Sequence, residues 1–103
     1  MHAIIAANRK QLIELCRRFG VTRLEVFGSA ARASDFDPGR SDIDFLVEFA
    51  ANSTDPRAFL DFSDALETLL GRPIDLVMRS AVEKSQNYIR RRAILRDAEA
   101  IYG

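Results

Sequence analysis

Cysteine is almost absent from this chain of 103 residues, in which Cys16 is the only one. A single cysteine cannot form an internal disulfide, and such usage is typical of a protein kept in a reducing cytoplasm. No apolar run approaches the length of a membrane span. The apolar opening, residues 1–7, precedes its positive charges, which is the wrong order for a secretory signal. We therefore expect a cytoplasmic protein that has no membrane partner.

Net charge is missing as well, because 15 basic residues balance 15 acidic ones. Nothing in this balance requires direct binding to nucleic acid. The sole histidine, His2, lies at an end that we expect to fray, and we assign it no role. An apolar content of 48% and a charged content of 29% are those of a globular protein. The length predicts one domain, residues 1–103, with one core.

Hydrophobic periodicity predicts helices and strands in alternation. Apolar residues spaced by three and four predict helices over residues 3–19 and 56–70, ended by Gly20 and Gly71. Strands are predicted over 24–27, 42–49 and 73–78, with a short helix over 30–33 and loops over 34–41 and 51–55. From Ser80 onward we expect a helix to the end of the chain, opened by a capping box of Ser80 and Glu83. The order α-β-α-β-α-β-α predicts an α/β fold with about three strands packed by four helices, and Cys16 as a buried small hydrophobe.

The stretches Val26-Phe27-Gly28-Ser29 and Ser41-Asp42-Ile43-Asp44 carry the candidate chemistry. Successive strand residues point to opposite faces, so Asp42 and Asp44 share a face. Their like charges repel unless a cation lies between them, and Mg²⁺ prefers such carboxylates together with substrate phosphates. Backbone N–H groups of the Gly28-Ser29 turn are suited to hold those phosphates. The pattern predicts a metal-assisted nucleotidyl-transfer site; solvated carboxylates and a simple Ser29 helix cap are the plain alternatives.

Three further features allow a functional or a structural interpretation. Asp75 lies in an apolar strand, where an isolated carboxylate is expensive to bury, and is either a metal ligand or an edge carboxylate paired with an arginine. Arg32 either reaches a phosphate or is solvated. The run Arg90, Arg91 and Arg92 forms either a patch that faces a partner or a solvated helix face.

The chain resembles the DNA polymerase β nucleotidyltransferase superfamily, and more closely the minimal nucleotidyltransferases that act as antitoxins beside HEPN-domain toxins. Three segments and the tail, residues 87–95, carry the resemblance: Phe27-Gly28-Ser29-Ala30-Ala31-Arg32, Ser41-Asp42-Ile43-Asp44-Phe45-Leu46-Val47 and Ile74-Asp75-Leu76-Val77. It implies that Asp42, Asp44 and Asp75 hold two Mg²⁺ ions, and that Gly28 and Ser29 cradle the β- and γ-phosphates of ATP. It also implies transfer of AMP to a tyrosine of the partner HEPN toxin, which would neutralise the toxin.

Two departures from the family pattern concern the loop between the motifs. Residues 30–41 make this loop two residues longer than is usual, and Ala33 replaces the glycine that usually follows the Ala-Arg pair. Longer loops cost little stability, so we expect the metal site to survive. An antitoxin that acts by binding alone is an alternative, although it has no use for the clustered aspartates. Adenylylation of a small molecule such as an aminoglycoside would need a second domain or a dimer cleft, and a homo- or hetero-oligomer stays open.

Overall fold

A four-stranded mixed sheet forms the centre of the molecule. The computed structural model describes residues 3–28, 31, 42–50 and 56–103. The strand order is β3-β2-β1-β4, where β1 is Val21–Phe27, β2 is Ile43–Phe49, β3 is Ile74–Met78 and β4 is Glu99–Tyr102. The strand β1 pairs antiparallel with both β2 and β4, and β2 pairs parallel with β3. The α/β class is thus confirmed, and the sheet has four strands where about three were predicted.

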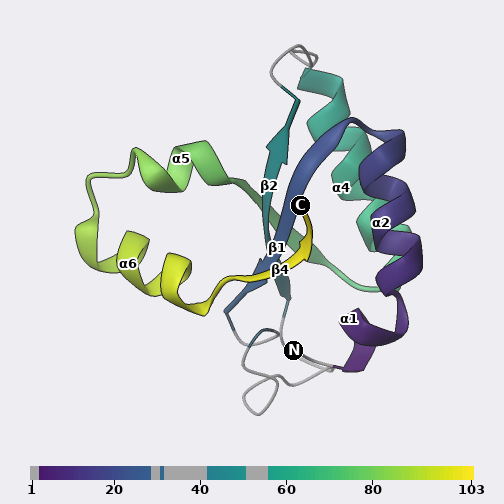
Figure 1. Ribbon diagram of the computed structural model, residues 1–103, viewed down its shortest axis with the longest axis horizontal. Helices are drawn as coiled ribbons and strands as arrows, with labels where there is room; N and C mark the ends of the chain where they lie inside the picture. Colours follow the sequence, from purple (N-terminus) through teal and green to yellow (C-terminus); the bar gives the residue numbers. More distant parts are fainter. Residues whose placement is uncertain (1–2, 29–30, 32–41, 51–55) are drawn as a thin grey trace.

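Helices cover both faces of this sheet (Figure 1). On one face lie α1 (Ala3–Ala7), α2 (Arg9–Arg18) and α4 (Pro56–Leu70); on the other lie α5 (Arg79–Glu83) and α6 (Tyr88–Asp97). In the part of the chain that is described, no helix combines the length and the apolar composition needed to cross a membrane.

Alternation along the strands divides the buried residues into two clusters. The large one lies under α2 and α4 and receives Ile43, Phe45 and Val47, each 0% exposed, as the strand pattern predicts. The small one lies under α5 and α6 and is centred on Phe27, Leu46 and Val82. Because Ile43 and Phe45 point into the large core, the residue between them must point to the α5–α6 side.

The first predicted helix is split into α1 and α2 at Asn8. The Asn8 side-chain amide donates to the Ile4 carbonyl at 2.8 Å, a local bond that competes with regular helix geometry. The predicted stops are confirmed, because Gly20 and Gly71 follow their helices with φ angles of 72° and 68°. Pro56 begins α4, as expected for a residue whose missing N–H costs nothing in the first turn.

The prediction of one helix from Ser80 to the end is wrong. The chain forms α5, a break after Glu83, α6, and then β4, which adds a fourth strand to the sheet. The capping box is also wrong: Met78 is the N-cap of α5, and the Glu83 carboxylate accepts from Arg79. The observed side-chain cap is Asn87, whose Oδ1 accepts from the Arg90 N–H at 3.1 Å and starts α6. Predicted loops over 34–41 and 51–55 and the short helix over 30–33 lie outside the described residues, apart from Ala31.

Candidate active site

Asp44 and Asp75 are register partners on the parallel strands β2 and β3. Neighbouring strands lie roughly 4.8 Å apart, and side chains in register point to the same face. The flanking residues set this orientation, because Ile74 and Leu76 pack against the large core as Ile43 and Phe45 do. Asp44 is half-buried and Asp75 is exposed. Two residues that are about thirty positions apart in the sequence are therefore held side by side, with like charges adjacent.

Gly28 closes the other side of Asp44. Gly28 directly follows β1, whose last residue, Phe27, is the register partner of Asp44. Its φ of 69° turns the chain away from the strand. A Cβ at this position would lie 2.6 Å from Oδ2 of Asp44, so a larger residue would have to displace the carboxylate and adopt a strained backbone conformation. The Ala31 N–H donates to the Gly28 carbonyl at 3.2 Å. Ser29 and Arg32, the other predicted phosphate-binding residues, lie outside the described residues.

Asp42 directly precedes β2 and is exposed. All three predicted aspartates are among the described residues, and within that part of the chain no three Asp, Glu, His or Cys side chains are gathered closely enough to hold a metal ion. The structure thus brings Asp44 and Asp75 together but does not gather Asp42 with them. Two adjacent carboxylates are nonetheless the donors that suit a hard divalent cation, which takes its other ligands from water and substrate phosphates.

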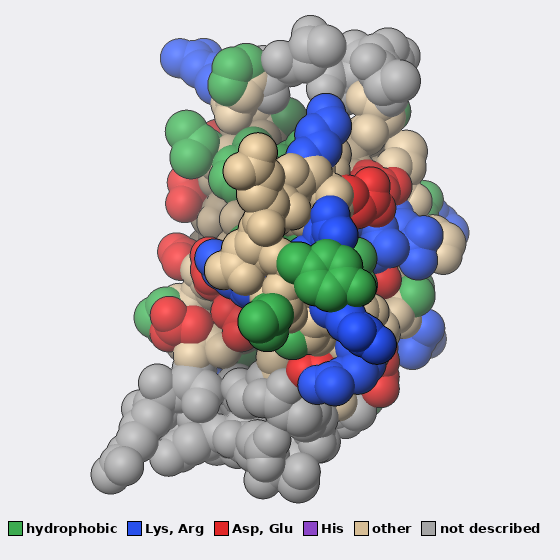
Figure 2. Space-filling model, turned by 90° about the vertical axis from the view of Figure 1, so that its left-hand side faces the viewer, with side chains coloured by type: hydrophobic (Ala, Val, Ile, Leu, Met, Phe, Trp, Pro, Cys, Tyr) green, Lys and Arg blue, Asp and Glu red, His purple; other side chains and the backbone are tan. Residues whose placement is uncertain are grey.

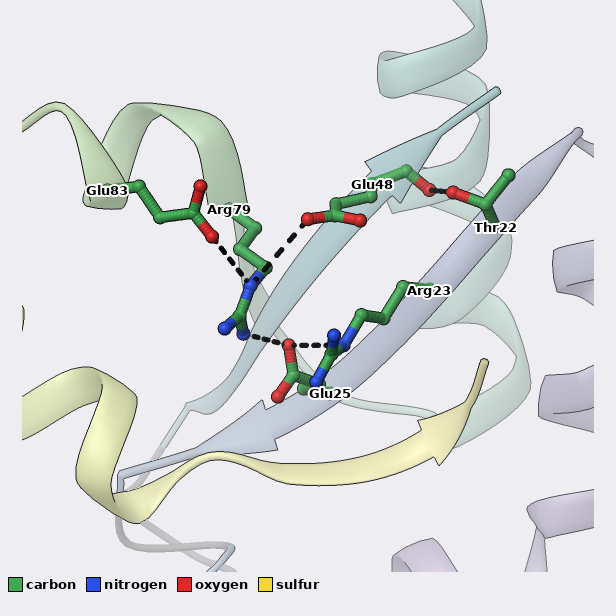
Figure 3. A network of polar contacts seen from close by, with 6 residues as sticks. All are labelled: Thr22, Arg23, Glu25, Glu48, Arg79 and Glu83. Atoms are coloured by element: carbon green, nitrogen blue, oxygen red, sulfur yellow. Dashed lines mark hydrogen bonds and ion pairs between the residues drawn. The ribbon is translucent and has the colours of Figure 1, made fainter. Parts of the chain in front are cut away.

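An ion network centred on a buried glutamate lies farther along the same sheet face, between β1, β2 and α5 (Figure 3). Glu25 is only 4% exposed, and its carboxylate pairs with the guanidinium of Arg79 and, at 3.1 Å, with that of Arg23. Arg79 also contacts Glu83 at 2.9 Å and Glu48 at 3.6 Å. Burial alone would lower the pKa of Arg79, but the charges of Glu25 and Glu83 outweigh it and raise the pKa above its usual value.

Sequence reasoning missed this network. Glu25 is the one acidic residue in a run that otherwise reads as a buried strand, Leu24 to Phe27, and that is a signal for a buried pair. Its partner Arg79 is 54 positions away, so the pairing itself could not be predicted. The network ties the start of α5 to the sheet and so holds the α5–α6 layer beside Asp44 and Asp75.

Known proteins similar to this chain are nucleotidyltransferases. A family model described as "Nucleotidyltransferase domain" matches residues 9–97. The chain is 37% identical over 83 residues to the protein adenylyltransferase MntA of Thermococcus cleftensis. The aligned residues cover 81% of this chain and 78% of that protein.

Solved structures give the same result. A solved structure of a minimal nucleotidyltransferase superposes with a TM-score of 0.73 at 34% identity. The superposition covers 92% of this chain and 90% of the other. A complex of the tri-AMPylated Shewanella oneidensis HEPN toxin with its MNT antitoxin gives a TM-score of 0.62 at 21% identity, covering 95% of this chain and 71% of the other, and at that identity it shows the fold alone. The matched residues include Gly28, Asp44 and Asp75, and the chain therefore belongs to the nucleotidyltransferase domain family.

Proposed function

We propose that this nucleotidyltransferase transfers AMP from ATP to a hydroxyl group, in particular a tyrosine, of a partner HEPN toxin and so acts as its antitoxin. The observation that carries the proposal is the register pair Asp44–Asp75 beside Gly28. The MntA relative is named a protein adenylyltransferase, and one structural neighbour is a complex with an AMPylated HEPN toxin. Both support protein as the acceptor.

The residues divide the work of binding and chemistry. In our proposal Asp42, Asp44 and Asp75 would hold Mg²⁺, which supplies positive charge to the ATP phosphates. Gly28 leaves space for the Asp44 carboxylate, and the turn after it, with Ser29 and Arg32, would bind the β- and γ-phosphates. Asp75 is exposed and so open to an incoming acceptor.

The proposed reaction is an in-line displacement. The acceptor hydroxyl oxygen attacks the α-phosphorus of ATP and forms the new O–P bond, while the bond from that phosphorus to the bridging oxygen of the β-phosphate breaks. Pyrophosphate leaves, and the hydroxyl proton passes to a carboxylate oxygen of Asp75. The product is the partner protein with AMP esterified to its hydroxyl.

The test is to incubate the chain with the product of the neighbouring gene, as the candidate toxin, together with ATP and MgCl₂, and to weigh that product by intact-protein mass spectrometry. We expect mass increments of one or more AMP groups, lost in Asp44→Asn and in Asp75→Asn. Asp61→Asn, at an exposed position on α4, is the matched control and should transfer normally. A toxin that binds the chain but gains no mass would contradict transfer and favour an antitoxin that acts by binding alone.

A further inference from the structure

The helix α6 carries apolar side chains on two opposite faces. Ile94, Leu95 and the following Ala98 point inward and pack on the small core beneath. Ile89 points away from it and is 82% exposed, and Tyr88 is 59% exposed. Single exposed apolar residues are ordinary, but an isoleucine this open directly beside an open tyrosine marks a surface suited to a partner.

These two residues belong to one stripe along the helix. At spacings of one, three and four, five residues share the outward side and line a shallow hollow of about 380 Å³. We name this stripe the outer face of α6; it consists of Tyr88, Ile89, Arg92, Ala93 and Arg96. Figure 2 views the molecule from the α5–α6 side, where Lys and Arg side chains gather around exposed hydrophobic ones.

The charge on the outer face is positive and poorly compensated. Among the described residues, Arg92 has no ion pair. The Arg96 side chain is 77% exposed and contacts the carboxylate of its neighbour Asp97 at 3.7 Å. The three consecutive arginines do not form one patch. Arg91 donates to the carbonyls of Glu83 and Ser85, which fastens α6 to the segment that ends α5, and its guanidinium lies over the Tyr88 ring at 5.3 Å.

The composition of the outer face is that of a protein-binding surface. Tyrosine and arginine around an aliphatic anchor are enriched at the energetic centres of protein interfaces. A surface for nucleic acid would use phosphate-binding cations and stacking rings, and an isoleucine that is 82% exposed contributes to neither. Positive charge around an apolar centre is complementary to an amphipathic helix whose apolar residues are flanked by Asp and Glu.

The position of α6 connects this surface to the site. The inner face of α6 packs on the cluster that contains Phe27, the register partner of Asp44. The helix therefore covers the same sheet face from which Asp44 and Asp75 project. We propose that the outer face of α6 docks the acceptor protein through an acidic amphipathic helix of that protein, an inference that rests on the function proposed above.

The test measures binding separately from transfer. The purified product of the neighbouring gene, as the candidate HEPN toxin, is titrated by biolayer interferometry against the wild-type chain, Ile89→Asp, and Arg92→Glu/Arg96→Glu. We expect each variant to raise the dissociation constant about tenfold or more, as for the loss of an interface anchor. Matched controls are Leu60→Asp, which is 62% exposed on α4, and Arg9→Glu/Lys10→Glu on α2, across the sheet. These should bind within about twofold of wild type.

Variants that bind the toxin as tightly as wild type would overturn the proposal. In that case, loss of tRNA binding or of self-association in the same variants would assign the surface to RNA or to a second copy of the chain. Absence of any binding by the wild-type chain would overturn it too. Circular dichroism melts verify that each variant is folded.

Failure of docking and failure of the function are distinguishable. Toxin binding that depends on Ile89 but adds no AMP would leave the docking surface standing and remove the transfer reaction. AMP addition at the wild-type rate by Ile89→Asp would do the opposite.

Discussion

At the scale of single residues, Gly28 is where backbone geometry and chemistry meet. Gly28→Ala forces a side chain into a φ of +69°, which costs about 1–2 kcal/mol, and places its Cβ against Oδ2 of Asp44. Gly71→Ala is the matched control, because its φ is +68° and nothing lies within 4 Å of the added Cβ. We expect both variants to lose similar stability in urea denaturation, and only Gly28→Ala to lose AMP transfer. Equal rates of AMP transfer by Gly28→Ala and Gly71→Ala would show that the close approach of Gly28 to Asp44 does not matter for the reaction.

Cys16 provides a residue-scale prediction about pH. It is completely buried, and burial raises the pKa of its thiol from 9.0 to about 12, although a backbone hydrogen bond opposes this. The thiol should therefore resist alkylation at pH 8 until the chain unfolds. Because the folded-state pKa is raised, the contribution of the buried thiol to the free energy of unfolding is fully present below about pH 9. It is lost as the pH rises toward 12.

At pH 10 this loss amounts to about 1.4 kcal/mol of unfolding free energy. Urea denaturation of the wild type and of Cys16→Ala at pH 8 and pH 10 measures it, because the alanine variant lacks this titration. A difference between the two proteins that is the same at both pH values would contradict the prediction.

At the scale of elements, the Glu25–Arg79 pair joins α5 to the sheet. Arg79→Met leaves the Glu25 carboxylate buried with only Arg23 beside it, and we expect a loss of about 3 kcal/mol of unfolding free energy. Replacing both partners, Glu25→Leu with Arg79→Met, should recover most of that loss, because a buried pair exchanged for apolar residues is often neutral. Urea denaturation of the double-mutant cycle measures the coupling, with exposed Arg96→Met as the control. A double variant no more stable than Arg79→Met would show that the pair is not the cause.

Local signals predicted most elements of this fold. The glycines at 20 and 71 and the proline at 56 act on backbone dihedrals in their own neighbourhood, so their effect is readable from sequence. The strand β4 was not predictable in this way. Its four residues have no clear alternation, and pairing with β1 joins Leu24 to Tyr102 across most of the chain. Tertiary pairing therefore overrode a segment whose local preference is helical.

The orientation of Asp44 and Asp75 was predictable for the same reason as the strands. Alternation places Asp44 opposite Ile43 and Phe45, and the apolar neighbours of Asp75 do likewise, so both had to leave the large core on one side. The parallel register that makes them neighbours is not local and came only from the structure. The position of Asp42 was harder to foresee, because it precedes β2 and the ladder does not orient it.

At the scale of the whole molecule, the proposed site joins β1, β2 and β3 at one end of the sheet through Gly28, Asp44 and Asp75. A ligand that binds there binds only the folded chain, and therefore stabilises the entire fold. At about 100 times its dissociation constant, Mg²⁺·ATP should add about 2.7 kcal/mol, a melting-temperature increase on the order of 10 °C. Differential scanning fluorimetry measures this increase, and EDTA should remove it.

Asp75→Asn should abolish that ligand-induced increase, yet without ligand it should melt slightly higher than wild type. The reason is that it removes a like charge directly beside Asp44, worth a few tenths of a kcal/mol. Asp61 is exposed on α4, on the opposite face of the sheet, so Asp61→Asn should leave both melting temperatures unchanged. An increase with Mg²⁺·ATP that survives in Asp75→Asn, or in EDTA, would place the nucleotide away from the two aspartates. A cation site therefore predicts two changes of opposite sign in Asp75→Asn: a higher melting temperature without ligand and a lost increase with Mg²⁺·ATP. If Asp75 is only a solvated carboxylate, the increase with Mg²⁺·ATP should remain.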